Sequence, residues 1–115
     1  SDCPVAPAVK EYMWNPYYGM EMAVTRYGVG ITGPAEDCCG QAPDQRLTIQ
    51  EALKCYTING ARQLRWEDQC GSIEAGKSAD FAVLNQNLYE IPVTEIHATM
   101  PEMTVFRGNT VFPKS

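Results

Sequence analysis

The 115-residue sequence predicts a small α+β domain, and three patterns carry this prediction. Residues 48–51 (Thr-Ile-Gln-Glu) form a capping box, which marks the start of a helix. Residues 80–84 (Asp-Phe-Ala-Val-Leu) follow a glycine-containing turn as an apolar run of strand length. Residues 103–112 are typical of two strands joined by a tight turn at Gly108-Asn109. We therefore expect helices in the first part of the chain and a sheet in the last.

The first helix is expected over residues 16–26. Asn15 is a suitable N-cap, and Pro16 fits the first helical position, where no hydrogen-bond partner exists for a backbone N–H. Apolar residues then recur at helical spacing, at Tyr17, Met20, Ala23 and Val24. A long, flexible loop is expected over residues 28–46, because glycine, proline and acidic residues dominate it. Loops of this length often border binding sites.

The capping box of Thr48 and Glu51 predicts a second helix with one apolar face, formed by Ile49, Ala52, Leu53 and Tyr56. Residues 57–60 interrupt this pattern, and Asn59 is expected to cap a shorter third helix. The turn-rich stretch at residues 71–79 then leads into a buried strand at residues 80–84. Further along, residues 94–97 predict a single helical turn that carries His97.

Composition argues against several classes of protein. The net charge is −5, and the basic residues form no cluster that would neutralise phosphates, so a nucleic-acid partner is not expected. No apolar run approaches the roughly 18–20 residues that span a bilayer, and no signal-peptide pattern opens the chain. We expect a cytoplasmic protein with no membrane partner. The five cysteines show no C-x-x-C spacing and are expected to be reduced thiols.

The residues alone indicate no catalytic site. His97 is the single histidine, so a histidine-based metal site is not expected. It lies among predicted sheet elements, far in sequence from any plausible nucleophile, so a catalytic triad is not expected either, and a structural or surface role is. The carboxylate pairs Glu36-Asp37 and Glu67-Asp68 lie in predicted turns, where solvation is the default. Asp2, judged by composition alone, is expected to be an exposed carboxylate near the start of the chain.

Several motifs nevertheless carry a family resemblance. Residues 47–53 (Leu-Thr-Ile-Gln-Glu-Ala-Leu), 56–61 (Tyr-Thr-Ile-Asn-Gly-Ala) and 71–84 resemble the C-terminal end of metal-dependent amidohydrolases, and residues 103–112 resemble their closing hairpin. With residues 1–5 and 23–26 included, the chain resembles amidohydrolase family 3, the group of YtcJ-like and N-substituted formamide deformylase-like proteins. The resemblance covers nearly the whole chain and is weakest between Gly28 and Pro43.

The resemblance implies a fold and a division of the chain. Residues 1–66 would be the end of strand eight and the last helices of a TIM-type (β/α)8 amidohydrolase barrel. Residues 67–115 would be part of the composite C-terminal β-sandwich. The chain is then expected to be a C-terminal fragment of a longer enzyme, because the family's metal-binding histidines would lie upstream of residue 1.

The resemblance also implies an activity and a site. The family consists of hydrolases that act on carbon–nitrogen bonds other than peptide bonds. Asp2 would match the aspartate that closes strand eight, a metal ligand that also relays a proton from the attacking water to the leaving nitrogen. A divalent metal, zinc, is expected in the full-length enzyme. None is expected on this fragment, since one carboxylate does not hold a catalytic zinc, and the chain alone should be inactive.

An alternative from a different class stays open, namely a free-standing structural or protein-interaction module without catalysis. In that case Asp2 is a terminal carboxylate and the loop at 28–46 is a binding surface. For the fragment, the expected partner is the missing N-terminal part of the enzyme, or a second copy that pairs with exposed strand edges. The reading frame upstream of Ser1 distinguishes the two hypotheses.

Overall fold

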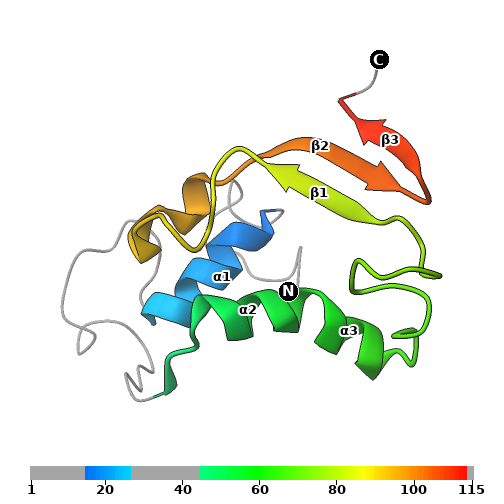
Figure 1. Ribbon diagram of the computed structural model, residues 1–115. Coiled ribbons are helices and arrows are strands. Elements are labelled where there is room, and N and C mark those ends of the chain that lie inside the picture. The colour runs from blue at the N-terminus through cyan, green and yellow to red at the C-terminus, as the bar shows by residue number, and fades with distance from the viewer. Residues whose placement is uncertain (1–14, 27–44, 114–115) are drawn as a thin grey trace, which may run out of the picture. The chain divides into compact units, whose positions relative to one another are not determined.

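The computed structural model describes residues 15–26 and 45–113. Its elements, in order, are α1 (Pro16–Thr25), α2 (Ile49–Tyr56), α3 (Ile58–Gln63), β1 (Phe81–Leu84), the 3-10 helix η3 (Val93–Ala98), β2 (Pro101–Phe106) and β3 (Asn109–Phe112) (Figure 1). The described part of the chain is therefore a small α+β structure, as predicted. The chain divides into two compact units, one formed by Ser1–Ala52 with Leu88–Ala98 and one formed by Leu53–Asn87 with Thr99–Ser115.

In the first unit, α1 packs against η3, which is the gold helix in Figure 1. The Asn15 side chain accepts a hydrogen bond from the Tyr17 N–H at 2.9 Å, and Pro16 occupies the first turn, so the predicted start of this helix is confirmed. At its other end, Arg26 adopts a left-handed φ of 63°. The buried apolar side chains of this unit are Met20, Val24, Ala52, Leu88 and Ile96.

The capping box at the start of α2 is confirmed. The Glu51 N–H donates to Thr48 Oγ1 at 3.2 Å, and the Thr48 N–H donates to Glu51 Oε2 at 2.8 Å. The predicted cap of α3 is wrong, because Thr57 precedes α3 and Asn59 lies inside it. Thr57 alone separates the two helices, which leaves no room for a cap at position 59. Its Oγ1 donates to the Leu53 carbonyl at 2.6 Å.

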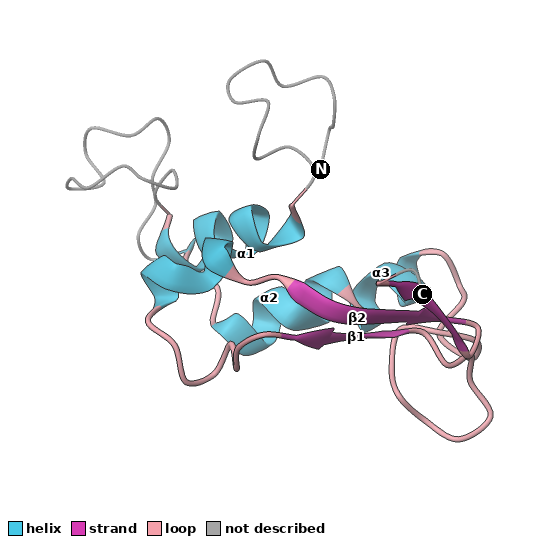
Figure 2. Cartoon of the chain, turned by 90° about the horizontal axis from the view of Figure 1, so that it is seen from above, coloured by secondary structure: helices cyan, strands magenta, loops and turns pink. Residues whose placement is uncertain are grey.

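In the second unit, three antiparallel strands form a sheet in the order β1-β2-β3. Figure 2 shows β1 and β2 side by side. The predicted hairpin is present, but its two-residue turn is Arg107-Gly108, one residue earlier than expected. Both residues have positive φ, 49° and 77°, which is the geometry of a type I′ turn and matches the right-handed twist of the strands.

The strand at residues 80–84 is confirmed in place but not in its burial. Ala82 and Val83 are exposed, and Val83 retains 40% of its accessible surface. All four residues of β3 are exposed, and Val105 is the buried apolar residue of the described sheet. An apolar run predicts a strand but does not specify what covers it, and among the described residues no further strand pairs with β1 or β3.

The stretch before β1 is held by hydrogen bonds within the second unit. Asp80 Oδ1 accepts hydrogen bonds from Ser78 Oγ at 3.0 Å and from the Arg107 N–H at 2.7 Å. The Gly108 N–H donates to the Ala79 carbonyl at 3.1 Å. The entry to β1 and the hairpin turn are therefore fixed to one another, although 27 residues separate Asp80 from Arg107.

Candidate functional site

The site residue expected from the resemblance, Asp2, lies outside the described residues, so its role stays a prediction. Most of the loop expected at 28–46 also lies outside them. The candidate groups that remain are the polar side chains of residues 15–26 and 45–113.

Metal-ligating side chains do not converge in this part of the chain. No three histidine, cysteine, aspartate or glutamate side chains among the described residues lie close enough together to hold a metal ion. Cys55 and Cys70 are free thiols. The described residues therefore do not fit the divalent metal that the family resemblance implies, and no reaction step through a metal follows from them.

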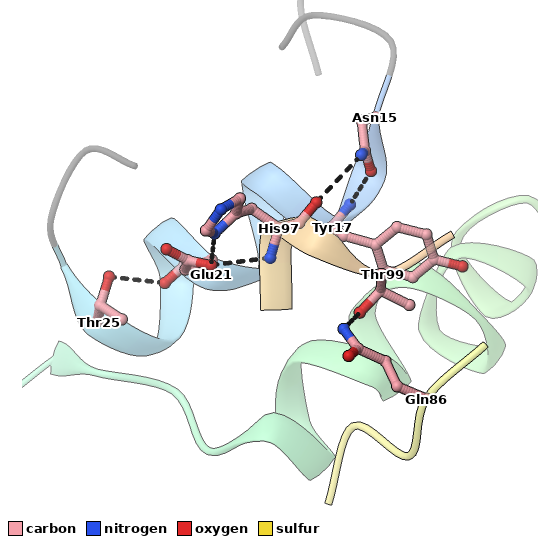
Figure 3. A network of polar contacts seen from close by, with 7 residues as sticks. All are labelled: Asn15, Tyr17, Glu21, Thr25, Gln86, His97 and Thr99. Atoms are coloured by element: carbon pink, nitrogen blue, oxygen red, sulfur yellow. Dashed lines mark hydrogen bonds and ion pairs between the residues drawn. The ribbon is translucent and has the colours of Figure 1, made fainter. Parts of the chain in front are cut away.

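The most developed polar arrangement joins α1 to η3 in the first unit (Figure 3). Glu21 lies on the buried face of α1, where its side chain is 6% exposed. Its Oε2 accepts a hydrogen bond from the His97 backbone N–H at 2.8 Å and lies 2.7 Å from His97 Nδ1. One carboxylate oxygen therefore holds both the backbone and the ring of a residue 76 positions further along the chain.

Neighbouring groups fix the same histidine. The Asn15 Nδ2 donates to the His97 carbonyl at 3.4 Å, and the Tyr18 ring lies 5.4 Å from the imidazole, centroid to centroid. Elsewhere on α1, burial raises the pKa of the Tyr17 hydroxyl, because an apolar environment disfavours the phenolate. The arrangement orients the imidazole and gives its Nδ1–H a carboxylate acceptor.

The sequence assigned His97 a structural or surface role, and its contacts confirm this. The importance of Glu21 was missed, although the sequence contained a signal for it. Residues 17, 20, 21, 24 and 25 follow the helical spacing of a buried stripe, and Met20, Glu21, Val24 and Thr25 are buried. A carboxylate inside such a stripe predicts a buried partner, because an isolated charge is rarely tolerated there.

Replacing Glu21 by alanine is expected to lower the free energy of unfolding by about 2 kcal/mol, since the substitution removes the acceptor of two hydrogen bonds. Glu21→Gln is the matched control, because its amide oxygen can still accept a hydrogen bond, and we expect about half that loss. Chemical denaturation followed by circular dichroism measures both values. If both variants unfold within about 0.5 kcal/mol of the wild type, the carboxylate is unimportant for stability.

A second polar cluster, formed by Ser72, Glu74 and Lys77, brings a serine and a lysine together. Lys77 Nζ lies 2.6 Å from Ser72 Oγ and 3.1 Å from Glu74 Oε1. Hydrogen bonds from Ser72 and Lys77, together with the Lys77 charge, hold the pKa of Glu74 below its usual range. Ser72 Oγ and Lys77 Nζ both donate to Glu74 Oε1, so the serine proton is directed at the carboxylate and not at the lysine. This cluster stabilises a turn and is not a nucleophilic site.

Thr99 is fully buried in the second unit, and its hydroxyl accepts a hydrogen bond from Gln86 Nε2 at 2.8 Å (Figure 3). Nearby, Asn85 pairs with Met100 through two hydrogen bonds, one from its backbone N–H and one to its side-chain oxygen. These contacts satisfy the buried Thr99 hydroxyl and the exposed polar groups of Asn85, and they offer no reactive group to a ligand.

Comparison with known proteins adds information that the described geometry lacks. The family model described as "Amidohydrolase family" matches residues 1–112. YtcJ of Bacillus subtilis, which is named as an amidohydrolase, is 30% identical over 116 residues, covering 100% of this chain and 20% of its own length. An imidazolonepropionase of Kosmotoga olearia is 35% identical over 104 residues, covering 90% of this chain and 21% of its own length.

An imidazolonepropionase of Bacteroides thetaiotaomicron is 37% identical over 68 residues, which cover 59% of this chain and 16% of the relative. The chain thus spans about a fifth of the length of these relatives. No solved structure matches it significantly. Among the helices that the structure describes, none has the length and apolar character needed to cross a membrane.

Proposed function

Because this chain belongs to the amidohydrolase family, we propose that it is the C-terminal part of a metal-dependent hydrolase acting on carbon–nitrogen bonds other than peptide bonds. The observation that carries the proposal is the family match over residues 1–112, which is nearly the whole chain. The names of the similar proteins, an amidohydrolase and imidazolonepropionases, support the same reaction class.

In this proposal residues 1–66 supply the end of barrel strand eight and the helices after it, and residues 67–115 supply part of a β-sandwich. Helices α1, α2 and α3 precede residue 67 and the three strands follow it, although the two compact units group α3 with the strands and η3 with α1. The edges of the small sheet support a partner as well. Neither β1 nor β3 carries a charged residue, whereas natural edge strands are commonly protected by charge.

The proposed partner is the N-terminal part of the same enzyme or a second copy bound at a strand edge. Asp2 would serve the intact enzyme as a metal ligand and proton relay, and zinc would be the metal. Since three metal-ligating side chains converge nowhere in the described residues, the other ligands would come from elsewhere in the longer protein.

The proposal is tested by comparing the 115-residue chain with the protein encoded by the complete reading frame. We expect bound metal and hydrolysis of small N-acyl or N-formyl amines from the longer protein, and neither from this chain. Mass spectrometry of metals and a chromatographic amine assay provide the two measurements. Turnover by this chain with added zinc would contradict its proposed dependence on the rest of the enzyme. A stop codon followed by a start codon directly upstream of Ser1 would favour the free-standing module.

A further inference from the structure

We propose that one face of the sheet in the second unit binds a second copy of this chain, with the strands of the two copies antiparallel. The strand register identifies this face, because Ala82 lies opposite Thr104, and Thr104 lies opposite Phe112. Glu102 and Phe106 share the face, since each is two residues from Thr104 along β2. We call these five residues the outer face. The inference concerns the 115-residue chain and does not rest on the hydrolase proposal.

The outer face is apolar at its centre and exposed to solvent. Phe106 retains 52% of its accessible surface and Phe112 retains 47%, and Ala82 is exposed as well. The opposite face of the sheet differs, because Val105, the neighbour of Phe106 in β2, is only 8% exposed. Exposed apolar side chains on adjacent strands of one face are typical of a surface that binds another protein.

Opposite charges lie at the two ends of the outer face. Glu102 is exposed near the start of β2. The Arg107 guanidinium lies over the Phe106 ring, with its Cζ 5.2 Å from the ring centroid, which places the positive charge at the end of β2. Glu102 and Phe106 are separated by roughly 13 Å along the strand. Among the described residues, neither Glu102 nor the Arg107 guanidinium takes part in an ion pair.

This charge distribution selects the orientation of the partner. Two identical sheets that pack face to face in a closed dimer are related by a two-fold axis in the plane between them. If the axis runs along the strands, Glu102 meets Glu102 of the second copy, and like charges repel. If the axis crosses the strands, the two copies of β2 run antiparallel, and Glu102 of each copy lies near Arg107 of the other.

The antiparallel arrangement also covers the apolar centre of each copy with that of the other. One carboxylate and one guanidinium balance at this face, so two copies do not repel one another there, although the whole chain has a net charge of −5. The outer face therefore fits a second copy of this chain, with an apolar centre and an ion pair at each end.

The test measures the molar mass of the 115-residue chain by sedimentation equilibrium, over a concentration series that reaches about 1 mM. We expect a reversible monomer–dimer equilibrium. Phe106→Lys should weaken dimerisation about tenfold or more, because it places a charge in the apolar centre. Thr110→Lys is the matched control, since Thr110 is exposed but lies opposite Val105 and so belongs to the other face. Its dimerisation should equal that of the wild type.

Three results overturn the proposal: a chain that stays monomeric throughout the series, a dimer that Phe106→Lys leaves intact, and equal losses for Phe106→Lys and Thr110→Lys. The last result indicates pairing through the edge of β3, to which Thr110 belongs.

Charge reversal tests the orientation, and it decides the question if Phe106→Lys does not fold. Glu102→Arg and Arg107→Glu should each weaken the dimer about three- to tenfold, because each variant brings like charges together at both ends of the interface. The double variant should dimerise more tightly than either single variant, since opposite charges meet again. A double variant that is no tighter than the single variants overturns the antiparallel arrangement.

Discussion

Replacing Gly71 by alanine is expected to lower the free energy of unfolding by about 2–5 kcal/mol. Gly71 has a φ of +89°, which an L side chain rarely adopts. A Cβ at this position would lie 2.6 Å from the Ala61 Cβ and 3.1 Å from the Ile58 Cα. Neither atom is the end of a flexible side chain, so α3 or the turn must shift to accept the methyl group. Thermal and chemical denaturation measure the loss.

Gly76 provides the matched control, because it has nearly the same backbone conformation, with a φ of +92°, and a Cβ there would meet no heavy atom within 4 Å. Gly76→Ala should therefore cost only the conformational strain, about 1–2 kcal/mol. The difference between the two variants isolates the steric clash of Gly71 with α3. Equal losses for the two substitutions would show that the close approach at Gly71 has no energetic importance.

Replacing Asp2 by asparagine in the full-length protein is expected to lower kcat about 10²–10⁴-fold, the range that general acid–base catalysis contributes. The proposed role of Asp2 requires a carboxylate that accepts a proton and releases it again. Asparagine preserves the shape of the side chain and cannot do either. Steady-state kinetics, with metal content measured in parallel, separates loss of proton relay from loss of bound metal.

Asp68→Asn is the control for this substitution, because Asp68 is an exposed aspartate in the turn after α3 and has no proposed catalytic role. Its kcat should remain at the wild-type value, which excludes a general effect of removing one negative charge. Wild-type turnover by Asp2→Asn would remove Asp2 from the proposed catalytic site while leaving the family membership of the chain unaffected.

Elements defined by local chemistry were predictable from the sequence. Asn15 and Pro16 specify the start of α1, and the Thr48–Glu51 pair specifies the start of α2, because each cap uses only neighbouring residues. The hairpin followed from its glycine and asparagine between apolar runs. Its turn differed by one residue, since Arg107 adopts a positive φ that its side chain gives no reason to expect.

Features that depend on distant residues were not predictable in this way. The pairing of Glu21 with His97 requires the packing of η3 on α1, which no local pattern encodes. The exposure of Val83 likewise depends on what covers the sheet and not on the strand itself. The proposed function rests on the family resemblance and on the comparisons with known proteins. It could not be inferred from the described residues, because no three metal-ligating side chains converge among them.

The separation of Glu21 from His97 also has a consequence for the timing of biosynthesis. The two residues lie 76 positions apart, and ribosomes add about 5–20 residues per second. Helix α1 is therefore synthesised about 4–15 seconds before His97, whose backbone N–H and imidazole contact its buried carboxylate. During this interval the contacts between α1 and η3 cannot form. Helix α1 therefore acquires its final packing only after η3 has been synthesised.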